Sequence, residues 1–170
     1  MEDEKFPFEE RLSKYRSPEL VETRTYETLY AVVRYPRVIV SKDFVECLGV
    51  ALYDPKSRTL GFTHIGQYSS PDRTLDEMIG DMKRRGASVR RMEAKLNGEL
   101  WDGGNPPSWA SKSVKAFLKT KKIPVVAEYL NKGAQDIIAH SATGKVEIYM
   151  YPEDEHRIFL CSPPVEITFI

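Results

Sequence analysis

The sequence is short of cysteine, of excess charge and of long apolar runs, and each shortage excludes a class of protein. Its 170 residues include only two cysteines, Cys47 and Cys161, too few for the disulfide framework of a small secreted domain. Basic and acidic residues balance at 25 each, so no basic excess points to nucleic acid as a partner. No apolar run reaches the roughly 20 residues of a membrane span, and the charged N-terminus lacks the apolar core of a secretory signal. We therefore expect a cytoplasmic protein with reduced thiols, no nucleic-acid partner and no membrane insertion.

Metal and nucleotide motifs are missing as well. The three histidines share no ligand-like spacing with each other or with the cysteines. The pair Gly103-Gly104 is better explained as a turn than as a phosphate-binding loop, and no Gly-x-Ser-x-Gly elbow occurs. The sequence therefore predicts a protein without a metal or an organic cofactor.

The chain divides into a polar lead-in, residues 1–25, and one domain over residues 26–170, which is an ordinary size for a single domain. In the lead-in, Phe8, Leu12 and Tyr15 fall at helical spacing and predict a short helix. Two possibilities stay open for this segment: a flexible tail, or a piece of chain docked on the core.

The domain over residues 26–170 combines many strands with two helices. Strands are predicted over 26–33, 37–41, 48–53, 59–65, 89–96, 123–130, 136–140, 145–151, 159–160 and 165–170. The apolar run 48–53 indicates a strand covered on both faces, and residues 97–107 are predicted to form a loop. The helices are predicted to begin after Ser70 and Ser108, with inner faces formed by Leu75, Met78, Ile79 and Met82 and by Val114, Phe117 and Leu118. This combination predicts an α+β fold, with both helices packed on one face of layered mixed or antiparallel sheets.

Cys47 is the remaining candidate for chemistry. It lies just before strand 48–53, and His64 lies on the return strand of the same hairpin, so the two side chains become neighbours on one sheet. A thiol needs a base or a cation nearby to become a nucleophile near neutral pH, and an imidazole supplies one. A third group that accepts the other ring N–H would fix the tautomer, and Ser41 is placed for this role if the intervening loop folds back. From these residues alone, inert packing of a buried cysteine is the commoner outcome.

The order of several short segments resembles the CheD family of chemoreceptor glutamine deamidases. The segments that carry the resemblance are Val38–Ser41, Cys47, Val50–Pro55 and His64, followed by Arg84–Ala87, Met92–Leu96, Val125–Glu128 and Thr143–Lys145. Each motif alone is weak, but they occur in the family's order over roughly residues 30 to 150.

The resemblance implies a CheD-like layered α+β fold with two main helices, and hydrolysis of a glutamine side-chain amide in a protein substrate. Carried over by position, Cys47 would be the nucleophile that forms a thioester, His64 the general base and acid, and Ser41 the residue that orients His64. The partner would be a protein with a reactive glutamine, such as a chemoreceptor or another signalling protein. The Cys–His–hydroxyl centre also resembles that of bacterial toxin deamidases of the cytotoxic necrotizing factor type.

The chain departs from the family pattern around the site. The family usually has a glycine-rich stretch before its cysteine, where this chain has Asp43-Phe44-Val45-Glu46, and a longer loop after its histidine. Two alternatives therefore stay open. One is a non-catalytic protein-binding module on a CheD-like scaffold, and the other is an amidase or toxin-type deamidase that acts on a different substrate.

Overall fold

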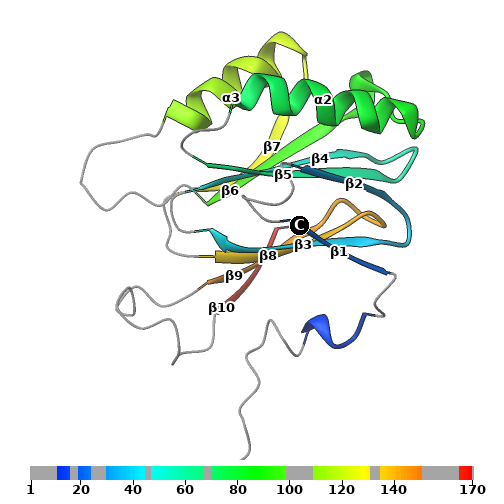
Figure 1. Ribbon diagram of the computed structural model, residues 1–170, viewed down its shortest axis with the longest axis vertical. Coiled ribbons are helices and arrows are strands. Elements are labelled where there is room, and N and C mark those ends of the chain that lie inside the picture. The colour runs from blue at the N-terminus through cyan, green and yellow to red at the C-terminus, as the bar shows by residue number, and fades with distance from the viewer. Residues whose placement is uncertain are drawn as a thin grey trace, which may run out of the picture.

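Two five-stranded sheets stack face to face, and helices α2 and α3 cover the outer face of one of them (Figure 1). The computed structural model describes residues 11–15, 19–23, 30–44, 47–66, 70–98, 109–130, 135–150 and 165–169. Within these residues the chain forms helix, sheet and sheet in three layers. This arrangement confirms the predicted α+β class with both helices on one side of layered sheets.

The helix-covered sheet has the strand order β2–β5–β4–β6–β7. Its strands are β2 (Tyr30–Arg34), β5 (Thr59–Ile65), β4 (Leu48–Asp54), β6 (Glu93–Gly98) and β7 (Val125–Leu130). All neighbours are antiparallel except β6 and β7, which are parallel. Every residue of β4 and β5 is buried, because helices cover one face and the second sheet covers the other. The prediction of a strand covered on both faces is confirmed.

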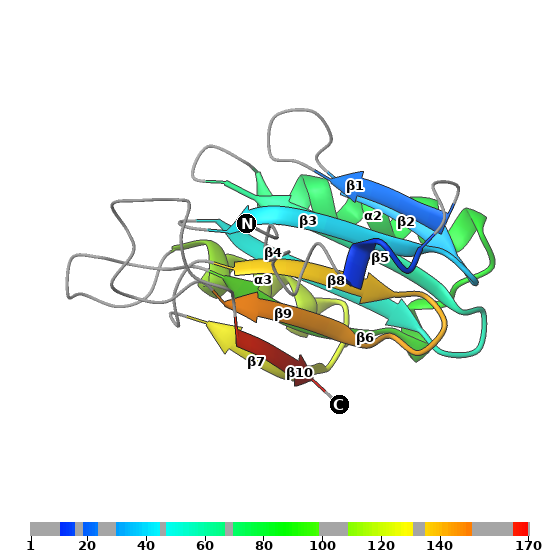
Figure 2. The ribbon, with the colours of Figure 1, turned by 90° about the horizontal axis from the view of Figure 1, so that it is seen from below.

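The second sheet has the strand order β1–β3–β8–β9–β10, which Figure 2 shows from below. Its strands are β1 (Leu20–Thr23), β3 (Val38–Phe44), β8 (Gln135–His140), β9 (Val146–Met150) and β10 (Val165–Phe169). Only β1 and β3 run parallel among these neighbours. The turn between β8 and β9 is the hairpin that the sequence predicts after His140.

The helices bury the faces that their apolar spacing predicts. Helix α2 (Pro71–Arg84) buries Leu75, Met78, Ile79 and Met82, and α3 (Trp109–Thr120) buries Val114, Phe117 and Leu118. Ser70 is the N-cap residue of α2, but its side chain makes no capping hydrogen bond. These faces pack on β4 and β6 and form one hydrophobic core, while a second core fills the space between the two sheets.

The structure corrects the secondary structure predicted for the segment around β6. Residues Val89–Arg91 form a turn of 3-10 helix, not the start of a strand, and β6 begins at Glu93. The reason is tertiary: the Arg91 guanidinium binds both oxygens of the buried Asp54 carboxylate at 2.9 and 2.6 Å. Strand β6 also runs on to Gly98, so Asn97 lies in a strand and not in the predicted loop.

The described part of the lead-in, residues 11–15 and 19–23, lies against the second sheet, and β1 pairs with β3. Residues 11 and 12 are helical, and Leu12 and Tyr15 pack on the outer face of the sheet against Val38, Val40, Ile138 and Tyr149. The predicted positions of Phe8, Cys161 and strand 159–160 lie outside the described residues.

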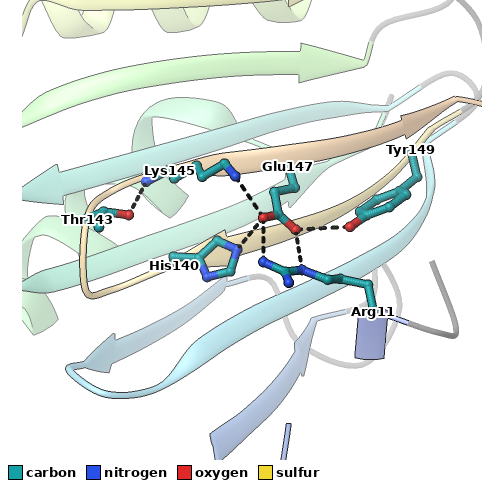
Figure 3. A network of polar contacts seen from close by, with 6 residues as sticks. All are labelled: Arg11, His140, Thr143, Lys145, Glu147 and Tyr149. Atoms are coloured by element: carbon teal, nitrogen blue, oxygen red, sulfur yellow. Dashed lines mark hydrogen bonds and ion pairs between the residues drawn. The ribbon is translucent and has the colours of Figure 1, made fainter. Parts of the chain in front are cut away.

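A buried carboxylate holds this segment in place (Figure 3). Glu147 accepts hydrogen bonds from Arg11 Nε and Nη2 at 3.0 and 2.9 Å, from Lys145 Nζ at 2.9 Å and from Tyr149 Oη at 3.0 Å. His140 Nε2 lies 3.4 Å from the same carboxylate. Burial alone would raise the pKa of Glu147, but its contacts with His140, Arg11 and Lys145 hold that pKa well below the usual range.

Candidate active site

A hydrogen bond between the two sheets joins Ser41 to His64. Ser41 Oγ, on β3, lies 3.2 Å from His64 Nδ1, on β5, and the two residues are 0% and 2% exposed. Both side chains face the core between the sheets, because Ile39 and Phe62, two positions earlier on each strand, belong to that core. The structure thus brings together two of the three residues predicted as a site, which lie 23 positions apart in sequence.

Cys47, the third predicted residue, is close to His64 by strand register. Gly49 of β4 lies directly opposite His64 of β5, and Cys47 comes two residues before Gly49 on the same face of the chain. Cys47 is half-buried and packs against the core between the sheets, and among the described residues it forms no disulfide. In the described part of the chain His64 Nε2 is buried and has no hydrogen-bond partner, so no hydrogen bond joins it to the thiol. Such contacts are often long without substrate and shorten in the complex.

The ring of Phe44 fixes the plane of His64. The two rings stack with centroids 3.9 Å apart and planes 16° from parallel. Ser41 and Phe44 are three residues apart and would face opposite sides of a regular strand, but β3 has a register irregularity between them, so both face inward. The sequence pattern did not single out Phe44, because a bulge leaves no sign in the spacing of apolar residues.

Burial controls the charge of His64. Desolvation lowers the pKa of His64 to about 4, so the imidazole is neutral at pH 7. When Nδ1–H donates to Ser41 Oγ, Nε2 carries the lone pair and can accept a proton. In the other tautomer Nδ1 accepts from Ser41 Oγ and Nε2 carries the proton, so only the first tautomer leaves a proton acceptor at Nε2.

Two further polar side chains lie between the sheets near His64, and the sequence analysis did not single them out. Asn97 of β6 lies opposite Gly49, and Gln135 of β8 lies opposite Phe44. Asn97 Nδ2 donates to Gln135 Oε1 at 3.3 Å, which makes a second polar bridge between the sheets. No motif connects the two residues in sequence, so only the register of four strands reveals the pair.

Two glycines permit the close approach of backbone and side chains here. A side chain at Gly49 would collide with the tip of Asn97 and with the ring of Phe62. Gly98 has φ of +90°, and a side chain there would collide with the carbonyl oxygen of Cys47. Glycine at these positions lets β6 lie tightly against the segment that carries the thiol.

The described residues lack two kinds of feature, a metal-binding cluster and a membrane-spanning helix. They contain no group of three or more His, Cys, Asp or Glu side chains arranged to hold a metal ion. None of their helices is both long enough and apolar enough to span a membrane.

Comparisons with curated proteins identify relatives of one kind. A probable chemoreceptor glutamine deamidase CheD of Thermococcus kodakarensis is 32% identical over 139 residues, which cover 70% of this chain and 86% of that protein. A second, from Desulforamulus reducens, is 30% identical over 70% of this chain and 84% of that protein. The chemoreceptor glutamine deamidase CheD of Thermotoga maritima is 29% identical over 58% of this chain and 72% of its own.

Comparisons with family models and with solved structures identify no further family. No family model matches the chain. Among solved structures, YlmD from Geobacillus stearothermophilus aligns with a TM-score of 0.48 and 10% identity, over 61% of this chain and 49% of that one.

Proposed function

The chain belongs to the CheD family of chemoreceptor glutamine deamidases, and we propose that it hydrolyses the side-chain amide of glutamine in a protein substrate. In this proposal Cys47 is the nucleophile, His64 is the general base and acid, and Ser41 orients His64. The observation that carries the proposal is the bond between Ser41 and His64, next to Cys47 in register and inside the core between the sheets.

The reaction has two half-reactions. His64 Nε2 accepts the thiol proton as Cys47 Sγ attacks the carboxamide carbon of glutamine, and the imidazolium then donates a proton to the leaving nitrogen, which departs as ammonia. The product of this step is a thioester on Cys47. His64 next accepts a proton from water, the hydroxide attacks the thioester carbon, and the thiol leaves with the proton from His64, which releases glutamate.

The neutral state of His64 suits the first step. With a pKa of about 4, the imidazole holds an available lone pair at neutral pH, but it is a weaker base than an exposed histidine, so in this proposal it accepts the thiol proton only as the attack takes place. Ser41 and the stacked ring of Phe44 limit the orientations that His64 can adopt. A base fixed in this way loses little entropy when the substrate arrives.

The test is ammonia release from the isolated cytoplasmic domain of a chemoreceptor, with mass spectrometry to locate each glutamine converted to glutamate. Wild type should release ammonia, Cys47→Ser should not, and Cys161→Ser serves as the matched control that keeps activity. Full activity of Cys47→Ser would end the proposal. Activity on other proteins but not on chemoreceptors would keep the chemistry and assign a different substrate.

A second candidate is a non-catalytic protein-binding module on the same scaffold. It is favoured by one observation: among the described residues, His64 Nε2 makes no hydrogen bond to Cys47. Alkylation of Cys47 by iodoacetamide across pH separates the two functions. A profile that follows an ordinary thiol of pKa about 8.5, identical in wild type and His64→Gln, would favour the binding module.

A further inference from the structure

A pair of buried carboxamides lies between the two sheets, at the end near Cys47, and the chemistry proposed above does not use it. Asn97 and Gln135 are 3% and 0% exposed and hydrogen-bond to each other between the sheets. A neutral bridge of this kind stabilises a core no more than apolar side chains of the same shape would. Gln135 Nε2, moreover, donates to no group in the part of the chain that the structure describes. A buried donor without an acceptor costs free energy, so its presence calls for an explanation.

Strand register places this pair beside the candidate catalytic groups. Asn97 and His64 flank Gly49 on its two neighbouring strands, and the tip of Asn97 occupies the space that a side chain of Gly49 would fill. Gln135 lies opposite Phe44, and Phe44 stacks on His64. The pair and the imidazole therefore surround one position on β4, two residues from the thiol.

Among the described residues, two buried nitrogen atoms without a hydrogen-bond partner lie in this small region. They are Gln135 Nε2, which is a donor, and His64 Nε2, which accepts in the tautomer that donates from Nδ1 to Ser41. A ligand that accepts from Gln135 Nε2 and also donates to the carbonyl of Asn97 needs an acceptor and an N–H donor side by side. A primary carboxamide has this pattern.

We infer that Asn97 and Gln135 bind the carboxamide of the substrate glutamine and hold it in front of Cys47; this inference rests on the proposed function. Gln135 Nε2 donates to the carbonyl oxygen of the substrate, and Asn97 Oδ1 accepts from its nitrogen. The same contacts discriminate against the product, because glutamate has no N–H at that position and turns a negative oxygen toward Asn97 Oδ1. The subsite thus favours release after hydrolysis.

Binding without turnover tests the subsite directly. A Cys47→Ala protein, isotopically labelled on nitrogen, is titrated with N-acetylglutamine methylamide while the side-chain amide signals are followed by NMR. The Gln135 signal, identified by its loss in Gln135→Met, should shift and saturate. The glutamate and methionine analogues should bind about tenfold more weakly, as expected for one lost hydrogen bond.

Variants separate a ligand contact from a structural bridge. Gln135→Met keeps length and burial, and it should weaken binding of the glutamine compound about tenfold while leaving the methionine compound unchanged. Lys95→Met is the matched control, because Lys95 lies on β6 as Asn97 does and donates across the sheets, to Gly144 O at 2.9 Å. This control should bind the glutamine compound within about twofold of the parent. If Gln135→Met does not fold, Gln135→Glu keeps the shape, lacks the NH₂ donor and should weaken binding similarly.

The outcomes distinguish the two proposals. Unchanged glutamine binding in the Gln135 variant, equal loss in Lys95→Met, or no preference for glutamine over glutamate would each overturn the inference. Selective glutamine binding in a protein whose wild type releases no ammonia would uphold the subsite and remove only the proposed reaction.

Discussion

The two ends of strand β4 differ in how completely their buried polar groups are hydrogen-bonded. At one end, the Asp54 carboxylate is 0% exposed and is fully engaged: Arg91 binds it with two nitrogens, and the backbone N–H groups of Ser88 and Lys56 donate to it at 2.9 and 3.0 Å. At the other end, near Cys47, the described residues leave His64 Nε2 and one amide nitrogen buried without a partner.

This difference matches a structural role for Asp54 and the functional role that we propose for the Cys47 end. Burial alone would raise the pKa of Asp54, but its hydrogen bonds from Arg91, Ser88 and Lys56 outweigh burial and hold that pKa far below the usual range. Asp54 therefore stabilises the turn of the hairpin as a permanent ion. At the Cys47 end, the described residues leave hydrogen-bonding capacity unmet, and our proposal assigns that capacity to the substrate.

The sharpest test of this comparison is a change at the functional end. Cys47→Ala should reduce ammonia release on the order of a thousandfold or more, because the nucleophile is gone. Its unfolding free energy should stay within about 1 kcal/mol of wild type, because the side chain is small and only half-buried. Urea denaturation and an ammonia assay on the same sample measure both. A large loss of stability with retained activity would reverse the assignment of the two ends.

The charge state of His64 gives the next largest effect. Its pKa is about 4 in the fold and near 6.5 when exposed, so between these values the unfolded chain binds a proton that the native chain does not. Stability should therefore be complete above about pH 6.5 and fall by about 3 kcal/mol as the pH drops toward 4. Denaturation at several pH values should show this slope in wild type and not in His64→Gln. The carboxylates of Asp54 and Glu147, whose pKa values are lowered in the fold, begin to lose their contribution only below about pH 5. Equal slopes in wild type and His64→Gln between about pH 5 and pH 6.5 would therefore contradict the burial of a neutral His64.

At the structural end, Asp54→Asn should cost about 2 kcal/mol of stability, because a neutral amide cannot replace the two-oxygen pairing with Arg91. Activity per folded molecule should stay unchanged. Glu77→Gln is the matched control, since its ion pair with Arg73 is exposed and should be worth less than about 0.5 kcal/mol. Chemical denaturation measures both, and equal losses would mean that the buried carboxylate is not special.

The smallest expected effect is at Ser41. Ser41→Ala should lower kcat about tenfold and leave KM unchanged, because it removes the bond that orients His64 and none of the reacting groups. Ser141→Ala is a matched buried serine, whose hydroxyl donates to Arg37 O away from Cys47, and it should keep kcat. If both variants match wild type, Ser41 is only a residue at a sheet interface.

Much of the fold follows from local patterns. The stripes of both helices and the hairpin around Asp54-Pro55 are confirmed because they depend on spacing within a few turns or strands. The prediction of a strand at Val89–Arg91 was wrong. The alternating pattern is real, but Arg91 binds the carboxylate of Asp54, which lies 37 residues earlier in the chain, and the segment forms a 3-10 turn. Asn97 falls in the loop predicted over 97–107 from its Asp-Gly-Gly-Asn-Pro-Pro run, but β6 continues to Gly98.

The candidate site likewise combines a feature that local sequence determines with contacts that it does not. The sequence by itself determined the hairpin that puts Cys47 and His64 on neighbouring strands, because that relation depends only on alternation and one turn. Only the tertiary structure decided that Ser41 meets His64, that a bulge turns Phe44 onto its ring, and that Asn97 meets Gln135. The physical reason is that each of these contacts joins one sheet to the other, and the stacking of two sheets depends on every side chain between them and not on any single segment.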